Sequence, residues 1–398
     1  YQAADGATFN FGQDSSFAAT KTAQGNQDSG GVGDFYYTPP TGFLALCTSN
    51  LPDVAVIPSE HFNTVLYTGT GSSNAITGVG FNPDLTWIKG RNNADSHNIE
   101  DVIRGKQRLF SNTTGAESAG GVESRGADGF TVDGGQDTNN AENHTYVAWN
   151  WKANGSGSSN TTGSINSTVS VNTDAGFSIV SYTGNATAGA TVGHGLSSTP
   201  EMIIIKDRSA AYDWMVGHKN YVGTPAENLK LNDTSGLATA DDAIGSTWNR
   251  TAFTSTVFTL GDGQGGDWTV RTNTQGSNLI AYCFHSVDGY SKVGSYVGNS
   301  SADGVFVNTG FKPAYVMVKN TSGWGWYIHD SAREPNNEND VFLLADSNAA
   351  DSATDNSHMD FLSNGFKLRT ASIIGNGSSY TLIYIAFAET PFKYSNAN

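Results

Sequence analysis

The chain has 398 residues, a length that suggests two to four domains. Glycine supplies 47 residues, only 15% of residues are charged and 11% are aromatic, which is typical of turn-rich β-proteins and excludes long disorder. The formal net charge of −16 gives a surface that repels nucleic-acid phosphates, so we expect no nucleic-acid partner.

Cysteine content and hydropathy narrow the possibilities further. Cys47 and Cys283 lie far apart, so we predict neither a disulfide framework nor a CxxC metal site, and we expect both thiols to be buried. No apolar run approaches 18 residues, so we expect no insertion into a membrane. The first residue is Tyr1 and not Met, so we expect further sequence before it.

The N-terminal part of the chain, residues 1–57, contains two alternating apolar segments that predict strands, at 9–13 and 41–48. A stretch rich in Gly, Asp, Ser and Gln separates them and predicts a loop. Two strands cannot bury a core alone. We therefore expect them to pair with upstream chain, with a partner subunit or with the rest of this chain.

One sequence pattern occurs three times in the remainder of the chain. Its prolines are Pro83, Pro200 and Pro313, and a lysine follows six positions later in each copy, at Lys89, Lys206 and Lys319. Tyrosines precede the prolines at similar intervals, at Tyr67, Tyr182 and Tyr296. The period matches a small domain and is too long for a solenoid repeat, so we predict one β-sandwich copied three times.

We therefore predict an all-β fold of tandem antiparallel β-sandwiches of the concanavalin-like or jelly-roll type. The expected boundaries are 1–57 for the end of an earlier sandwich or linking strands, 58–152 for repeat 1, 153–172 for a Gly/Ser/Asn/Thr linker, 173–292 for repeat 2 and 293–398 for repeat 3. Such copies in one chain predict beads or a stack.

The strand that closes each repeat is apolar on both faces, which predicts a central strand that is covered on both sides. A small residue is expected at the same place in each copy, namely Ala148, Ala281 and Ala386. A fixed small residue implies a close neighbour on that side.

The sequence shows little that predicts catalysis. The eight histidines form no HExxH motif, and no Gly-x-Ser-x-Gly elbow is placed between a strand and a helix. Glu100 and Asp101 are adjacent and would point to opposite faces of a strand, which is wrong for a glycosidase pair. We therefore expect no enzymatic activity, although a carboxylate pair could still assemble from distant residues.

Aromatic residues beside glycines are the best candidates for ligand binding, because exposed rings stack on sugars. They are Trp324, Trp326 and Trp268. The alternative is that they belong to the core, since the second repeat has an apolar strand at the place of the first two. Asp262 and Asp267 lie in an Asp/Gly loop that could bind Ca²⁺ through oxygen atoms, or could simply be a tight turn. We expect no other cofactor.

The repeated pattern resembles virion proteins of tailed bacteriophages, especially those of marine bacteria and cyanobacteria. The resemblance rests on an opening Tyr-Thr-Gly, on Gly-Phe-x-Pro-Asp-x-x-Trp-Ile-Lys from Gly80 to Lys89, and on Tyr-Val-Ala-Trp-x-Trp from Tyr146 to Trp151. Residues 9–52 resemble the C-terminal end of a SPRY-like sandwich that often lies upstream in such proteins. The resemblance defines no catalytic residues.

The resemblance implies a non-enzymatic structural protein on the surface of the phage particle, in a tail fibre, a spike or a head appendage. Its expected partners are other virion proteins, host-surface glycan and further copies of itself, with a trimer expected in a fibre. One alternative is a capsid decoration or tail scaffold protein without a ligand. Another is a glycan-degrading sandwich enzyme, which needs two carboxyl groups about 5–9.5 Å apart in a groove.

Overall fold

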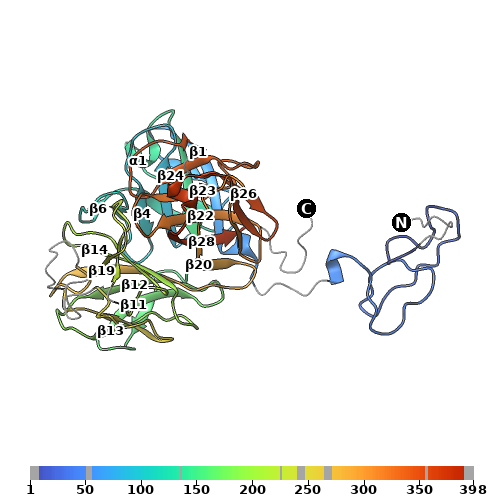
Figure 1. The fold of residues 1–398 in the computed structure, drawn as a ribbon, viewed down its shortest axis with the longest axis horizontal. Coiled ribbons are helices and arrows are strands. Elements are labelled where there is room, and N and C mark those ends of the chain that lie inside the picture. Colours follow the sequence, from blue (N-terminus) through green and yellow to red (C-terminus); the bar gives the residue numbers. More distant parts are fainter. Residues whose placement is uncertain are drawn as a thin grey trace. The chain divides into compact units, whose positions relative to one another are not determined.

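The computed structural model describes residues 9–50, 56–134, 137–224, 226–239, 247–263, 271–354 and 357–389. The chain divides into two compact units, whose described parts are an N-terminal unit, residues 9–50, and a body, residues 56–389 (Figure 1). Each is described by itself. In the described parts of the chain, no helix is long and apolar enough to span a membrane.

The N-terminal unit is held together by side chains that bond to backbone, and the strands expected at 9–13 and 41–48 are absent from it. Among its described residues, strand pairing is limited to a bridge between Asn26 and Phe35. The Asp28 carboxylate accepts hydrogen bonds from the backbone N–H of Ala45 at 2.8 Å and from Asn50 Nδ2 at 2.7 Å. The Ala45 bond is the main reason why the pKa of Asp28 falls to about 2.

The body is all-β, as expected, and consists of three antiparallel sandwiches, one per repeat. In repeat 1, after the short 3-10 turn η2 (Pro58–Glu60), the large sheet has the order β1 (Phe62–Thr68), β9 (Thr145–Trp151), β3 (Leu85–Gly90), β4 (Asn98–Asp101), β5 (Gln107–Phe110), β6 (Ser118–Ala119). The small sheet that covers one face has the order β2 (Asn74–Ile76), β8 (Gly129–Val132), β7 (Val122–Gly126). A single helical turn, α1 (Asp137–Asn140), precedes β9.

Repeats 2 and 3 follow the same plan. The large sheet of repeat 2 has the order β10 (Ser158–Asn160), β11 (Ser167–Asn172), β12 (Phe177–Thr183), β19 (Asn278–Phe284), β14 (Met202–Asp207), β15 (Met215–His218), β16 (Ala226–Lys230), β17 (Ala238–Thr239), and the small sheet pairs β13 (Ala190–Gly193) with β18 (Val257–Leu260). In repeat 3 the orders are β20 (Ser291–Val297), β28 (Thr381–Ala388), β22 (Pro313–Asn320), β23 (Trp326–Asp330), β24 (Val341–Leu344), β25 (Ser352–Ala353), and β21 (Phe306–Asn308), β27 (Gly365–Leu368), β26 (Met359–Leu362); α2 (Ile373–Asn376) precedes β28.

The prediction of a linker at 153–172 is wrong, because β10 and β11 lie there and extend the large sheet of repeat 2. The stretch is rich in Ser, Thr and Asn, which suggested a linker. Within it, however, Val169 is buried in the sandwich core of repeat 2. Val169 and Val171, two β-branched residues on alternate positions, suffice to place β11 over that core.

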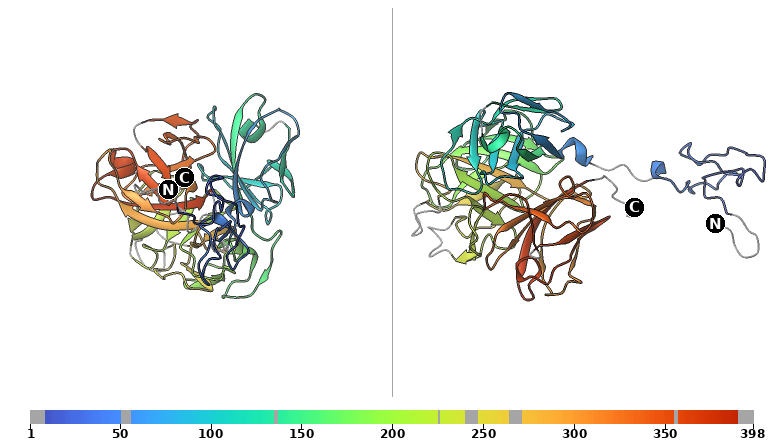
Figure 2. Two further views of the ribbon diagram at one scale, coloured as in Figure 1. Left: turned by 90° about the vertical axis from the view of Figure 1, so that its right-hand side faces the viewer. Right: turned by 90° about the horizontal axis from the view of Figure 1, so that it is seen from above.

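The prediction of beads or a stack is also wrong, because the three large sheets share one central core. In the left view of Figure 2 the repeats, coloured teal, green to yellow and orange to red, surround a common centre. One apolar cluster joins Trp149 of repeat 1, Tyr282 of repeat 2 and Ile385 of repeat 3, while each sandwich keeps a separate core of its own. Each large sheet is therefore covered on one face by its small sheet and on the other by the two neighbouring repeats.

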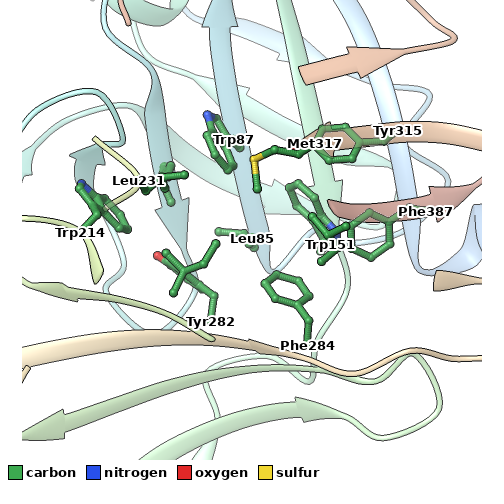
Figure 3. A pocket seen from close by; sticks show the side chains of 13 residues that line it. Leu85, Trp87, Trp151, Trp214, Leu231, Tyr282, Phe284, Tyr315, Met317 and Phe387 are labelled. Atoms are coloured by element: carbon green, nitrogen blue, oxygen red, sulfur yellow. The ribbon is translucent and has the colours of Figure 1, made fainter. Parts of the chain in front are cut away.

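The central core is closely packed. Strand register places Leu85, Met202 and Tyr315 at equivalent positions, so each repeat fills the centre with a side chain of different size. The void that remains is about 30 Å³ and has an apolar lining contributed by all three repeats, with the side chains pointing toward one another (Figure 3). A space of that size holds about one water, and this one offers too few polar partners for it.

The expected alignment of Ala148, Ala281 and Ala386 fails in the third repeat. Ala148 pairs with Val65 and Ala281 with Val180, but the register of β28 puts Tyr384 at this place, opposite Gly294. A Cβ on Gly294 would lie 2.6 Å from the Tyr384 Oη. Repeat 3 has thus exchanged the large and small members of one cross-strand pair, which conserves volume.

A latch with the same geometry in all three repeats ties the strand that carries the repeated tyrosine to the segment just before the closing strand. The hydroxyls of Tyr67, Tyr182 and Tyr296 donate to backbone carbonyls of that segment at 2.6, 2.8 and 2.9 Å. The next residue of the segment is an asparagine whose Oδ1 accepts the backbone N–H of the residue two positions beyond the tyrosine strand, at 3.0, 2.9 and 3.0 Å for Asn140, Asn273 and Asn376. The repeated Tyr-x-Gly motif is explained by this contact.

We expect Asn376→Ala to lower the free energy of unfolding by about 2–4 kcal/mol, because it removes an acceptor and leaves buried backbone groups unpaired. Asn376 is fully buried and its Nδ2 also donates to the carbonyls of Ser301 and Thr370. Chemical denaturation would measure the loss. Asn308→Ala, at an exposed asparagine with one local bond, is the control and should cost less than about 1 kcal/mol. If the two variants lose the same free energy of unfolding, the latch contributes no more than an ordinary exposed asparagine.

Candidate functional site

Buried polar side chains lie where the repeats meet. His97, Trp214 and Trp326 occupy equivalent positions, opposite the repeated lysines. Each donates a ring N–H to a carbonyl of the neighbouring repeat: His97 Nε2 to Leu344 at 2.9 Å, Trp214 Nε1 to Phe110 at 2.9 Å and Trp326 Nε1 to Lys230 at 2.8 Å. The three bonds run in one direction around the centre and close it as a ring.

The prediction that Trp326 binds a ligand is therefore wrong. Its side chain is fully buried, and its N–H is used at the contact between repeats 3 and 2. Its neighbouring glycines suggested an exposed platform, but they belong to the turn that leads into β23.

His97 is neutral in this arrangement. Trp87 Nε1 donates to His97 Nδ1 at 2.8 Å, so the imidazole keeps its proton on Nε2 and donates that to repeat 3. Complete burial, with Lys89 nearby, holds the pKa of His97 well below its usual range.

Two of the three interfaces contain a buried ionic network of the same design. In the first, Arg104 contacts Asp101 at 2.6 Å, and Asp101 also accepts the hydroxyl of Tyr282 from repeat 2 at 2.8 Å. Arg208 of repeat 2 completes the network by contacting Glu117 at 2.9 Å. Burial acts to raise the pKa of Asp101, but the Arg104 guanidinium and these hydrogen bonds hold it below its usual value.

The second network joins repeats 3 and 1. Arg333 contacts Asp330 at 2.6 Å, and Trp149 Nε1 of repeat 1 donates to Asp330 at 3.0 Å. Arg91 of repeat 1 contacts Asp351 at 2.8 Å, in the place of the Arg208–Glu117 pair. Asp330 and Asp351 thus hold repeats 3 and 1 together.

The third interface keeps the backbone contact, but among the residues that the structure describes the Asp–Arg pair is replaced by other residues. The backbone N–H groups of Glu117, Asp351 and Leu237 bond to the neighbouring repeat at 3.0, 2.7 and 2.6 Å. Where the other two interfaces have an Asp–Arg pair, repeat 2 has His218 and Tyr221. The protein itself therefore shows that this contact can be made without the ion pair.

We expect Arg104→Met to destabilise the body by about 3–5 kcal/mol, because Asp101 would stay buried without its counter-ion. Replacing both partners with the residues of repeat 2, Asp101→His with Arg104→Tyr, should cost less than about 2 kcal/mol. Equilibrium unfolding in guanidinium chloride would compare them. If the double variant is no more stable than the single one, the ionic pair contributes through packing alone.

The three repeated lysines are fully buried and bond to backbone carbonyls of the turn that follows their strand. The Nζ of Lys206 donates to the carbonyls of Asp207 at 2.6 Å and Ala210 at 3.1 Å, and Lys89 does the same in repeat 1. Lys319 donates to the carbonyls of Trp324 and, at 3.2 Å, of Asp233 in repeat 2. Burial lowers the pKa of each lysine to about 8.

Of the two predicted ligand residues that the structure describes, Trp324 is the one that reaches the surface. Its φ of +67° lies in the left-handed region, and this backbone turns its carbonyl toward Lys319. The indole is half-buried and meets the ring of Tyr380 edge-on, with the centroids 5.8 Å apart. Trp268, the third predicted ligand residue, lies outside the described residues.

The predicted Ca²⁺ site can be compared with the structure only in part. Asp262 is half-buried after β18, beside Gly263, whose carbonyl accepts a bond from Arg271. Asp267 lies outside the described residues. Within the described ranges, no group of three or more His, Cys, Asp or Glu side chains is placed to hold a metal ion.

One position inside the sandwiches differs in every repeat, and of its three residues the sequence drew attention only to Glu100. It holds Glu100 in repeat 1, Gly217 in repeat 2 and His329 in repeat 3. A Cβ on Gly217 would lie 2.7 Å from the rings of Trp248 and Phe253, which fill that space. His329 bonds to Asn339 at 2.9 Å and Ser357 at 3.1 Å, and burial lowers its pKa to about 3.

Glu100 is fully buried and only partly paired. As expected from its neighbour, it points away from Asp101, into the sandwich. Its Oε2 accepts the backbone N–H of Val122 at 2.5 Å, whereas Oε1 has no hydrogen-bond partner. Gly121 has a φ of +106°, a backbone conformation that strains any other residue, and a Cβ there would lie 1.9 Å from Oε1. Burial raises the pKa of Glu100 to about 7, although Arg125 lies nearby.

The comparison with known families bears on the whole body. A family described as a domain of unknown function, DUF7483, matches residues 57–391. The chain belongs to the DUF7483 family. No curated protein and no solved structure matches the chain. The match covers all three repeats together, and in this DUF7483 chain the three repeats likewise form one unit with a shared core.

We expect Glu100→Gln to stabilise the protein at pH 8 by about 3 kcal/mol and to have no such effect near pH 4.5, as measured by unfolding at each pH. The pKa of Glu100 has its ordinary value of 4.5 in the unfolded chain and is about 7 in the folded chain, so folding favours the protonated acid. That contribution is complete below pH 4.5 and is lost as the pH rises to 7. Glu123→Gln, exposed on β7, is the control for removal of one charge. A pH-independent gain would contradict this account.

Proposed function

We propose that this chain is a non-enzymatic structural protein of a phage particle, displayed on a tail fibre, a spike or a head appendage. The observation that carries the proposal is the shared core. The three sandwiches form one body, in which the inner face of each large sheet is buried against the other two repeats. The ionisable groups at the contacts hold repeats together. Such a body offers rigidity and outer surface, which is what a particle appendage needs.

We further propose that the body adheres to host-surface glycan through Trp324 and Tyr380. Both rings are half-buried, and the contact between Trp324 and Lys319 fixes the backbone beneath the indole. A ring held in place stacks on a sugar without loss of side-chain entropy. The net charge of −16 favours a neutral glycan over an acidic one. Several copies on one particle would strengthen weak sites by avidity.

The test incubates the purified chain with envelope polysaccharide of a candidate host. Binding would be measured by calorimetry, and products by chromatography. We expect binding without cleavage, and a loss of about 5- to 30-fold in affinity for Trp324→Ala, as for removal of about 1–2 kcal/mol. Phe306→Ala, at an exposed ring of the same repeat, is the control.

The other outcomes separate the alternatives. Neither binding nor cleavage, together with antibody labelling of intact particles, would favour a capsid decoration or tail scaffold protein without a ligand. Released sugars would favour a glycan-degrading enzyme. Failure of an antibody against this chain to label any phage particle would contradict the structural role.

A further inference from the structure

The N-terminal unit presents an apolar groove. The groove has a volume of about 640 Å³, and its lining comes mainly from Phe, Tyr, Pro and Leu side chains. Leu46 is 83% exposed, Tyr37 79% and Phe43 67%, and Phe9, Phe11 and Leu44 are each about half exposed. Single exposed apolar residues are ordinary on protein surfaces, but a contiguous set of this size marks an interaction site.

The unit has almost no core of its own to hold these side chains. Among residues 9–50, Ala45 is the only buried apolar residue, and the described backbone has a single β-bridge. The aromatic residues of this unit therefore gain burial only from something that covers the groove. Burial of such rings is a large favourable term, so an occupant is strongly favoured.

The groove carries no charge that could select a charged partner. The carboxylates of the unit turn toward its own backbone: Asp14 accepts from Ser16 N at 2.8 Å, Asp28 from Ala45 N at 2.8 Å and Asp34 from Ser15 N at 3.0 Å. The lining residues include only two with polar side-chain amide or hydroxyl groups besides the tyrosines, Asn10 and Thr38. This is too few for recognition of a sugar or an anion.

We propose that this groove is the surface through which two copies of the chain associate. The six exposed side chains offer on the order of 700 Å² of apolar area, close to the roughly 800 Å² that each partner contributes to a standard interface. An uncharged apolar surface is complementary to an identical one, and a two-fold contact uses the same patch on both copies.

Residues 1–50 contain four acidic and one basic residue, a net charge of −3. This charge is small in total, so it opposes an apolar contact only weakly, although its density per residue is no lower than that of the rest of the chain. The inference goes beyond the proposed function, since it holds wherever the protein works.

Cys47 provides a probe at the rim of the groove. We expected it to be buried, but it is exposed, next to Leu46, because the predicted strand at 41–48 does not form. Cys283 is buried in the core of repeat 2, and burial raises the pKa of its thiol to about 12. A maleimide dye on the folded chain should therefore label Cys47 selectively.

The experiment measures the mass of the full chain by sedimentation velocity over a range of concentrations. We expect a dimer at micromolar concentration, strengthened by sulfate, and at least a 100-fold weaker association for Phe43→Asp with Leu46→Asp. Leu66→Asp, at an exposed apolar residue of the body, is the control and should leave the dimer intact. An environment-sensitive dye on Cys47 should shift to the blue as the protein associates.

The remaining outcomes overturn the proposal. A wild-type chain that stays monomeric into the tens of micromolar range would do so, as would a double variant that associates like wild type. Loss of the dimer in Leu66→Asp alone would place the interface on the body. A dye that is shielded in the monomer would show that the chain itself covers the groove. None of these results bears on glycan binding at Trp324, which a monomer could also show.

Discussion

The body depends on the burial of its large sheets from both sides. A sandwich covers only one face of a sheet, and the last strand of each repeat is apolar on the other face as well. One repeat alone would expose an apolar face that includes Trp149 or Tyr282. Three copies arranged around a centre remove that cost together, because each inner face is covered by the other two. The repeats are consequently parts of one folding unit.

The features that are the same in all repeats are those that satisfy backbone groups. The tyrosine and asparagine of the latch, the buried lysine and the ring N–H at each contact all bond to carbonyl or N–H groups. A buried backbone group that loses its partner costs free energy in every copy, so its partner cannot vary freely. Contacts between side chains differ among the repeats, and both partners of a pair differ together. The pair Gly294–Tyr384, for example, has its small residue on the strand where the other repeats have the larger one.

The sequence was sufficient to predict the fold class and the triplication, because the prolines and lysines recur at a domain-sized interval and the strands are rich in β-branched and aromatic residues. It was not sufficient to predict the ring. The apolar character of both faces of the last strand was visible, but a pattern does not say what covers a face. Trp326 shows the same difficulty, since the carbonyl that accepts its N–H is 96 residues away in another repeat.

A functional side chain is expected at a position whose side chain is not needed to hold the three repeats together. The buried lysine of each repeat needs a carbonyl from the following turn, supplied by Asn93, Ala210 and Trp324. Only the backbone carbonyl of each residue accepts the lysine's hydrogen bond, so this bond places no requirement on the residue's side chain. The fold therefore does not explain why Trp324, a half-exposed tryptophan, stands where repeat 2 has Ala210. Ligand binding at Trp324 would use a side chain that the fold does not need. The same holds for the groove of the N-terminal unit, because its exposed rings contribute little to the stability of that unit.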